Sequence, residues 1–263
     1  MKNGEIGIIK KIISSVDSFF NDDTTYYAAS LSFFTIFSIL PIIALGIAII
    51  SSFPEFNSYL EVFTNFLFDF LNPTHSTEIV ESLKNYISNS NKLGFIGILY
   101  MLFVFVMFFK DYDYIVNKIH KTQRRAIYKS FFIYLILFIV FPAIFIAITY
   151  ANSLHENSIF KFISSFLFTW FMFFALFKIS INKKLSIKVV LISSFLTLAT
   201  LSITKNLFVY YVVYNKTYTT IYGSLATLLF TFLWIYISWI IYLFGIKICH
   251  RLNINESKKY IKF

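Results

Sequence analysis

The sequence predicts an all-α, polytopic membrane protein with six transmembrane helices, an amphipathic N-terminal helix and an outer helical hairpin. Two features of composition support this. Hydrophobic residues make up 58% of the 263 residues and charged residues 14%, against about 25% charged in a typical soluble domain. The mean hydropathy is +0.72. So apolar a composition excludes a disordered or fibrous chain. It also excludes an ordinary soluble domain, because a domain of this size could not bury so many apolar side chains.

The third observation is that six apolar runs have the length needed to cross about 30 Å of hydrocarbon. The second run is short but uncharged, and the fifth is interrupted by Lys205, which we expect at its outer boundary. No run starts close enough to Met1 to be a cleavable signal peptide. In chain order, the six runs are residues 32–53, 93–109, 131–150, 162–177, 189–213 and 224–246.

Basic residues are distributed unequally between the two sides that six spans define. Eighteen of the 23 Lys and Arg lie in the N-terminal segment, the loops 110–130 and 178–188, and the tail from Lys247. The other five lie on the opposite side. Because positive charge collects in cytoplasmic loops, we expect both termini in the cytoplasm and the chain in the bacterial inner membrane. The same rule accounts for the net charge of +10 without a nucleic-acid partner.

Two amphipathic segments lie outside the spans, within what we predict to be one domain, residues 1–263. Residues 1–23 carry apolar side chains three and four positions apart, which predicts a helix lying on the membrane surface. The largest loop, 54–92, contains two short amphipathic patterns separated by Asn72-Pro73, a pair that breaks helices. We expect this loop to form the outer helical hairpin.

Small and hydroxylated residues recur at helical spacing inside three spans. Two interpretations stay open, because such residues either let helices pack closely or line a cavity for an amphiphile. A proline in the first of these spans favours a kink. The candidate lining residues are Ser32, Thr35, Ser38 and Pro41 in the first span, Ser193, Thr197, Thr200 and Thr204 in the fifth, and Tyr222, Gly223, Ser224, Thr227, Thr231 and Ser238 at the sixth.

The sequence offers no motif for catalysis, a cofactor or a metal. No pair of its four histidines has metal-ligand spacing, and it contains no phosphate-binding loop, nucleophile elbow or kinase signature. The single cysteine, Cys249, allows no intramolecular disulfide and is interpreted as structural. Charge-free cores in five spans argue against a proton relay or an ion pump. We therefore predict no catalytic residue, no cofactor and no metal site.

The most basic stretch follows the second span. Its cations are predicted to contact anionic lipid headgroups. The alternative is that they form local ion pairs and act only as the positive charge that sets the orientation of the chain in the membrane. The candidate lipid contacts are Lys118, Lys121, Arg124 and Arg125.

Three segments resemble the YihY/BrkB family of bacterial inner-membrane proteins. Residues 26–35, followed by Ser38-Ile39-Leu40-Pro41, are similar to that family's A-A-x-L-A-[YF]-[YF]-T-x-x-S-[LI]-x-P stretch. The segment 93–97 opens the second span as in the family, and Asn117-Lys118 matches its A-L-N region. The third segment, 221–225 with Trp234, Tyr236 and Gly245, resembles the family's carboxy-terminal pattern.

The chain departs from the family pattern in three places. Lys247 stands where the family has glutamate, and His120 stands where it has an aromatic residue. At the end of the second span, small residues are replaced by the bulky side chains of Phe105, Met107, Phe108 and Phe109.

The resemblance implies a six-span inner-membrane protein, and three functions stay open. The polar helix faces favour a transporter or handler of lipid-like or small amphiphilic substrates. A non-catalytic envelope assembly protein would use the 54–92 hairpin to bind an envelope protein partner. The family's historical label, ribonuclease BN, suggests a membrane-bound ribonuclease, which we disfavour because metal-dependent hydrolysis needs clustered ligands that the loops lack.

Overall fold

The computed structural model describes residues 23–51, 59–71, 81, 85, 94–154, 157–214 and 224–261. These residues form seven helices and no strand, which confirms the all-α fold. The predicted N-terminal amphipathic helix and most of the 54–92 hairpin lie outside the described residues. The helices are α2 (Asp23–Ser51), α3 (Leu60–Leu71), α5 (Gly94–Ile119), α6 (Ile127–Ser153), α7 (Ser158–Ser180), α8 (Ile187–Tyr214) and α10 (Ser224–Ile261).

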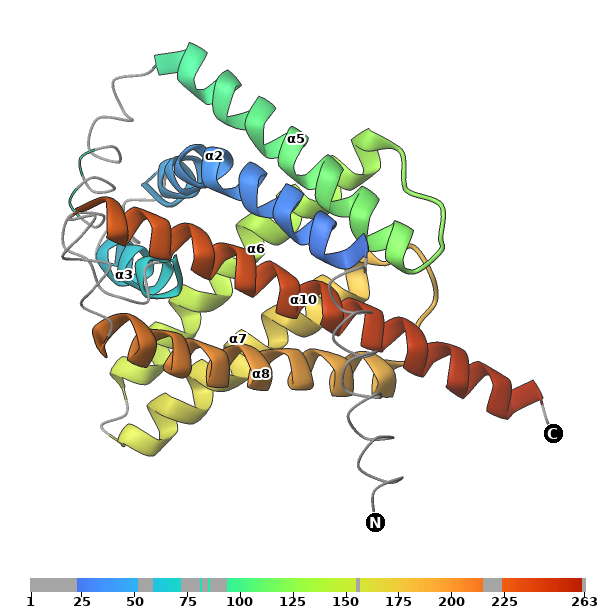
Figure 1. The fold of residues 1–263 in the computed structure, drawn as a ribbon. Helices are drawn as coiled ribbons and strands as arrows, with labels where there is room; N and C mark the ends of the chain where they lie inside the picture. The colour runs from blue at the N-terminus through green and yellow to red at the C-terminus, as the bar shows by residue number, and fades with distance from the viewer. Residues whose placement is uncertain are drawn as a thin grey trace.

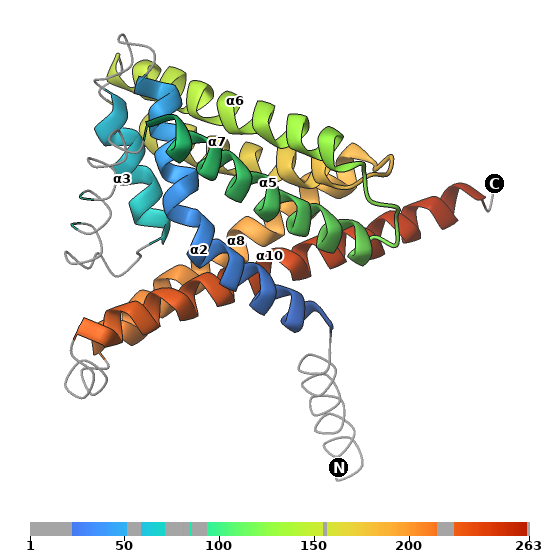
Figure 2. The same cartoon turned by 90° about the horizontal axis from the view of Figure 1, so that it is seen from above.

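Five of the described helices, namely α2, α6, α7, α8 and α10, are long and apolar enough to cross a membrane. They contain the third to sixth predicted runs and residues 32–51 of the first. The second predicted run, 93–109, coincides with the first part of α5. Because α5 is not among the five, a sixth span stays a prediction. The helix α10 continues past the predicted end at residue 246 to Ile261 and projects beyond the bundle (Figures 1 and 2).

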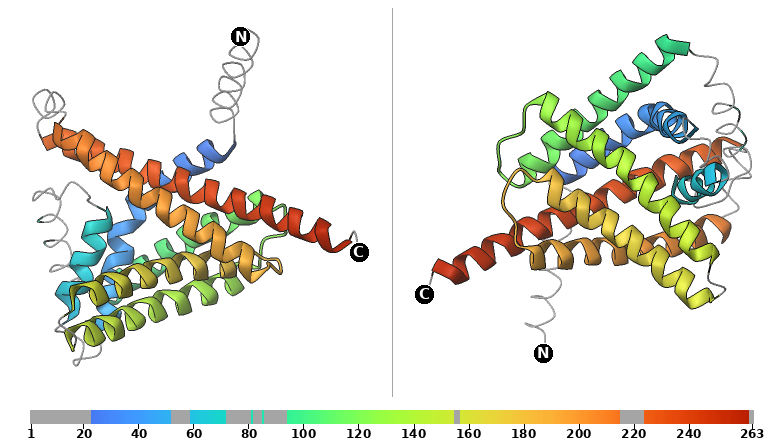
Figure 3. Two further views of the ribbon diagram at one scale, coloured as in Figure 1. Left: turned by 90° about the horizontal axis from the view of Figure 1, so that it is seen from below. Right: turned by 180° about the vertical axis from the view of Figure 1, so that it is seen from behind.

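The six long helices form a closed ring. Going round it, α2 packs on α5, α5 on α6, α6 on α7, α7 on α8, α8 on α10, and α10 back on α2. Successive helices run in opposite directions (Figures 1 and 3), and α3 contacts α2, α6 and α10. Helix α10 also contacts α5, and α2 also contacts α6, across the ring. Six cylinders in a ring leave a space at their centre, which side chains of this protein must fill.

Large aromatic side chains fill most of that central space. Phe105, Tyr134 and Trp234 are among the largest side chains that are fully buried. The ring of Phe109 stacks on Tyr134 with centroids 4.6 Å apart and lies 4.5 Å from Phe105. Such pairs add about 0.5–1.5 kcal/mol each beyond the burial of their area, so the α5–α6 contact is largely aromatic.

One end of the bundle, which we call the basic end, carries the loops 120–126 and 181–186. There α5 terminates in a Schellman motif, because the amide of Thr122 donates to Asn117 O (2.9 Å) and that of Lys121 to Lys118 O (3.1 Å). Lys121 has a φ of 52°, a left-handed conformation that usually favours glycine. This turn sends the chain back into α6.

Candidate functional site

A cavity of about 370 Å³ lies inside the helix ring. All six ring helices and α3 contribute to its wall, and the volume is within the range of small-molecule sites, about 300–1,000 Å³. Most of the wall is aliphatic or aromatic. The apolar wall residues are Phe66, Leu67, Phe108, Phe109, Leu137, Phe138, Phe141, Met172, Phe173, Leu176, Leu201, Trp234 and Ile235.

Hydroxyl groups on the wall are bonded to the protein itself. Thr35, Thr169 and Ser238 each donate to the backbone carbonyl four residues earlier, at 2.7–2.9 Å. Trp239 Nε1 also donates to Thr35 Oγ1 at 2.8 Å, which joins α10 to α2. The cavity therefore presents apolar surface with a few hydrogen-bond acceptors and no unpaired hydroxyl proton at these three positions.

Three buried tyrosines line the cavity at the basic end. The hydroxyl of Tyr112 lies 3.0 Å from Ser180 Oγ and is also hydrogen-bonded to the hydroxyl of Tyr242. Tyr134 donates to Asp113 Oδ1 at 2.9 Å. The phenol rings form this end of the wall, and their hydroxyls are bonded to one another and to a polar cluster behind them. The rings therefore separate the apolar cavity from that cluster.

Behind the tyrosines, Asp113 and Arg125 form an ion pair. Arg125 Nη1 lies 3.5 Å from Asp113 Oδ1, and the aspartate side chain is almost completely buried. Arg125 Nη2 also donates to the carbonyl of Ile179 (2.5 Å) at the end of α7. Removing one partner of a buried pair typically costs about 3–5 kcal/mol, so the pair fixes the 120–126 loop against α7.

Asn117 is the central residue of the polar cluster. Its Nδ2 donates to the carbonyls of Asp113 (2.8 Å) and Ser180 (3.0 Å). Its Oδ1 accepts from the amide of Asn182 (2.7 Å) and the hydroxyl of Thr122 (2.9 Å). An amide side chain has two donor hydrogens and two acceptor lone pairs, so all four are used. This single side chain joins α5, its terminal turn and the loop after α7.

His120 lies at the end of the same cluster, against α10. Its Nε2 is 3.1 Å from Ile246 O, and Nδ1 is buried with no partner in the described part of the chain. The ring centroid of His250 is 4.9 Å away. Burial, with smaller contributions from the positive charges of His250 and Lys183, lowers the pKa of His120 to about 4 from its ordinary 6.5. His120 is therefore neutral at pH 7.

Acid is expected to destabilise the protein through His120. Its pKa is lower in the folded chain than in the unfolded chain, so the stabilising difference is complete above pH 6.5 and is lost as the pH falls towards 4. The loss from this group reaches about 3 kcal/mol. His120→Phe, which removes the titrating ring, should abolish this part of the loss. Melting temperatures in detergent at pH 7 and 4.5 measure it, and equal losses in both proteins would contradict the assignment.

The predicted lining residues occupy different environments. Thr35 and Ser238 line the cavity, and Thr200 is exposed on the outer face of α8. Thr204, Thr227 and Thr231 are half-buried. Tyr222, Gly223 and the side chain of Ser224 lie outside the described residues. The remaining five are buried, namely Ser32, Ser38, Pro41, Ser193 and Thr197.

The predicted lipid contacts divide in a similar way. Lys118, Lys121 and Arg124 are exposed, and Lys118 Nζ lies 5.2 Å from the ring centroid of Tyr27 on α2. Arg125 instead turns inward to Asp113. The aromatic wall was not predicted from the sequence, whereas Asn117 belongs to a matched family segment.

Comparison with known proteins places the chain among membrane proteins. The family model described as "Virulence factor BrkB" matches residues 15–260. A UPF0761 membrane protein of Haemophilus influenzae is 31% identical over 238 residues, which cover 86% of this chain and 88% of that protein. One from Aggregatibacter aphrophilus is 29% identical over 250 residues, covering 90% of each. No solved structure matches the chain.

Proposed function

The chain belongs to the BrkB family of integral membrane proteins, and we propose that it is a transporter or handler of lipid-like amphiphiles. The substrate binds in the cavity inside the helix ring. The observation that carries this proposal is a cavity of about 370 Å³ whose wall is almost wholly apolar and largely aromatic.

The chemistry of the wall favours an amphiphile over an ion or a sugar. Among the described residues, no charged side chain lines the cavity, and Asp113 and Arg125 lie behind Tyr134. Transferring a charged or strongly polar solute into such a site would cost several kcal/mol without compensating partners. An apolar chain loses nothing there.

The cavity wall includes two residues that depart from the family pattern. Phe108 and Phe109 lie on the wall, at positions where the family pattern has small residues. Phe109 packs on Tyr134 of α6 and Phe108 lies near Trp239 of α10, so both rings reduce the width of the cavity. We therefore expect the substrate to be selected by the width of its apolar part. The two positions that depart from the family pattern therefore lie on the cavity wall.

The same proposal includes the orientation of the chain in the bacterial inner membrane. The loops 120–126 and 181–186 lie together at the basic end, beside the start of α2 (Figure 1). The positive charge of these segments supports placing that end in the cytoplasm. The assembly alternative depends on the 54–92 hairpin, of which α3 is the main described part. In the described residues, no group of three or more His, Cys, Asp or Glu could hold a metal ion for a ribonuclease.

Tryptophan fluorescence can test occupancy of the cavity. Trp234 and Trp239 line it, whereas the third tryptophan, Trp170, does not. A brominated single-chain amphiphile, added to the purified protein in an unbrominated detergent, should quench part of the emission and saturate as a single site. Quenching that rises without saturation would indicate partitioning into the micelle and would contradict the proposal.

Two matched variants make this test specific. Thr169→Phe adds a ring to the cavity wall, and Thr200→Phe adds the same ring to the exposed face of α8. The first should weaken binding of the amphiphile by about tenfold or more, equivalent to about 1.4 kcal/mol, and the second should leave its affinity unchanged. Equal affinity in the two variants would exclude the cavity as the binding site.

A further inference from the structure

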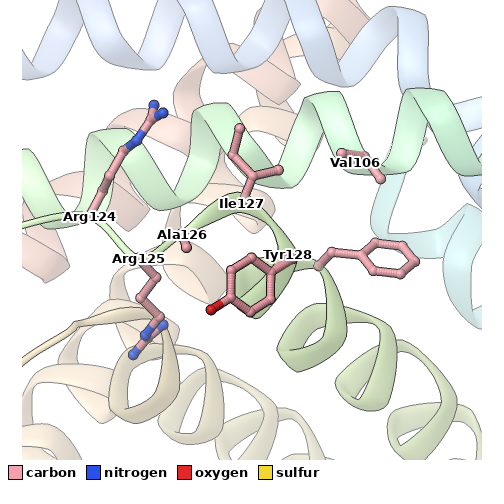
Figure 4. A pocket seen from close by; sticks show the side chains of 7 residues that line it. Val106, Arg124, Arg125, Ala126, Ile127 and Tyr128 are labelled. Atoms are coloured by element: carbon pink, nitrogen blue, oxygen red, sulfur yellow. The ribbon is translucent and has the colours of Figure 1, made fainter.

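A second hollow lies on the outer surface of the bundle, between α5 and the start of α6. It is an open groove of about 770 Å³, and no residue lines both this groove and the central cavity. Figure 4 shows its side chains. Its walls are Val106 from α5, and Arg124, Arg125, Ile127, Tyr128 and Phe131 from the loop and α6.

The groove is polar at one end and apolar at the other. In Figure 4, the two arginines and the hydroxyl of Tyr128 lie towards one end, and Val106 lies at the opposite end. Ile127 and Tyr128 are exposed, with 45% and 62% of their surfaces accessible. A groove of this polarity, at the point where α6 enters its apolar run, suits a molecule with a charged head and a hydrocarbon tail.

Positive charge dominates the polar end, because the nearby carboxylate of Asp113 is already paired with Arg125. From residue 114 to residue 155 the chain contains no Asp or Glu, whereas the segment 118–129 carries five Lys and Arg. The Nζ of Lys129 lies 5.9 Å from the ring centroid of Tyr128, so a further cation stands at the rim. This local field attracts an anion and repels a cationic head.

The two arginines of the groove have different roles. Arg125 is already bound to Asp113 and to carbonyls at the end of α7. Arg124 points to the other side of the loop (Figure 4), is exposed, and has no acidic partner among the described residues. A guanidinium so placed can bind two phosphate oxygens at once.

We propose that this groove is a binding site for an anionic phospholipid of the surrounding membrane. Arg124 binds the phosphate, Tyr128 lies at the level of the headgroup, and an acyl chain runs along Ile127, Phe131 and Val106. A phospholipid is the occupant that matches both ends, because a soluble anion leaves the apolar end uncovered. The site is independent of the central cavity and of what binds there.

Native mass spectrometry of the full chain in detergent can measure this binding with phosphatidylglycerol and phosphatidylcholine. Wild-type protein should prefer phosphatidylglycerol. Arg124→Gln should weaken binding of phosphatidylglycerol by about tenfold or more, as expected for the loss of a hydrogen-bonded charge. The control, Lys184→Gln, removes another exposed cation at the basic end and should cost at most the roughly fivefold effect of a general surface charge. Equal losses in the two variants would overturn the proposal.

A second pair of variants tests the apolar end. Val106→Trp should obstruct the groove and weaken binding of both phospholipids. Ile139→Trp, on an exposed part of α6, should leave binding unchanged. Inorganic phosphate at the same concentration should leave bound phosphatidylglycerol in place. If phosphate displaces it, or if Val106→Trp binds as well as Ile139→Trp, the groove is not a phospholipid site.

Discussion

Gly245→Ala is expected to destabilise the helix ring by about 3 kcal/mol or more, the upper part of the range for overpacked cores. A Cβ atom at position 245 would overlap Thr197 Oγ1 and lie 3.0 Å from the Cβ and Cγ2 atoms of that threonine. Both residues are buried where α10 packs on α8. Thr197 cannot rotate away freely, because its side chain is β-branched and its hydroxyl donates to Ser193 O at 2.7 Å.

Thermal unfolding in detergent measures the effect of Gly245→Ala, and two controls define its cause. Gly46→Ala should be milder, because the nearest atom to its Cβ is the tip of the Phe138 ring at 3.2 Å. Thr197→Ala introduced together with Gly245→Ala should recover much of the loss, since it removes two of the three crowded atoms. If the double variant is no more stable than Gly245→Ala alone, the clash is not at Thr197.

Asn117→Leu is expected to cost on the order of 3–5 kcal/mol, because each buried group left without a partner costs about 1–3 kcal/mol. The Asn182 amide would lose its partner, and the Ser180 carbonyl would keep only a long hydrogen bond of 3.4 Å from Arg125 Nη1. The control is Asn182→Ala, which keeps the backbone amide and removes only an exposed side chain bonded to Gln123 O. We expect it to cost less than about 1 kcal/mol. Unfolding free energies that are similar for the two variants would show that Asn117 is not central to the cluster.

The helices could be predicted because each is encoded locally. An uncharged apolar run of sufficient length indicates a membrane helix wherever it lies in the chain. The helix α3 could be predicted for a similar reason, since its apolar pattern ends just before Asn72-Pro73. The closed ring could not, because it depends on contacts such as that between α2 and α10, which are distant in the sequence.

The hydroxyl stripes show why the cavity wall could not be read from the sequence. A threonine within a membrane helix can donate to its own helix, as Thr231 does to Thr227 O, so it need not point inward. Thr197 is buried and Thr200 exposed, although both belong to one stripe. The wall is instead mainly aromatic, and with 35 phenylalanines in the chain no single ring is a signal for a site.

The central claim is that an amphiphile occupies the space inside the ring, and photolabelling tests it most directly. A single-chain amphiphile with a photoreactive group on its chain would be crosslinked to the full protein and the labelled peptides mapped, with and without an unlabelled competitor. The account predicts competable labelling at wall residues of α6 and α7, such as Leu137, Phe141 and Met172. Labelling confined to the exposed outer residues of α6, such as Phe132 and Ile136, and insensitive to competitor would contradict it.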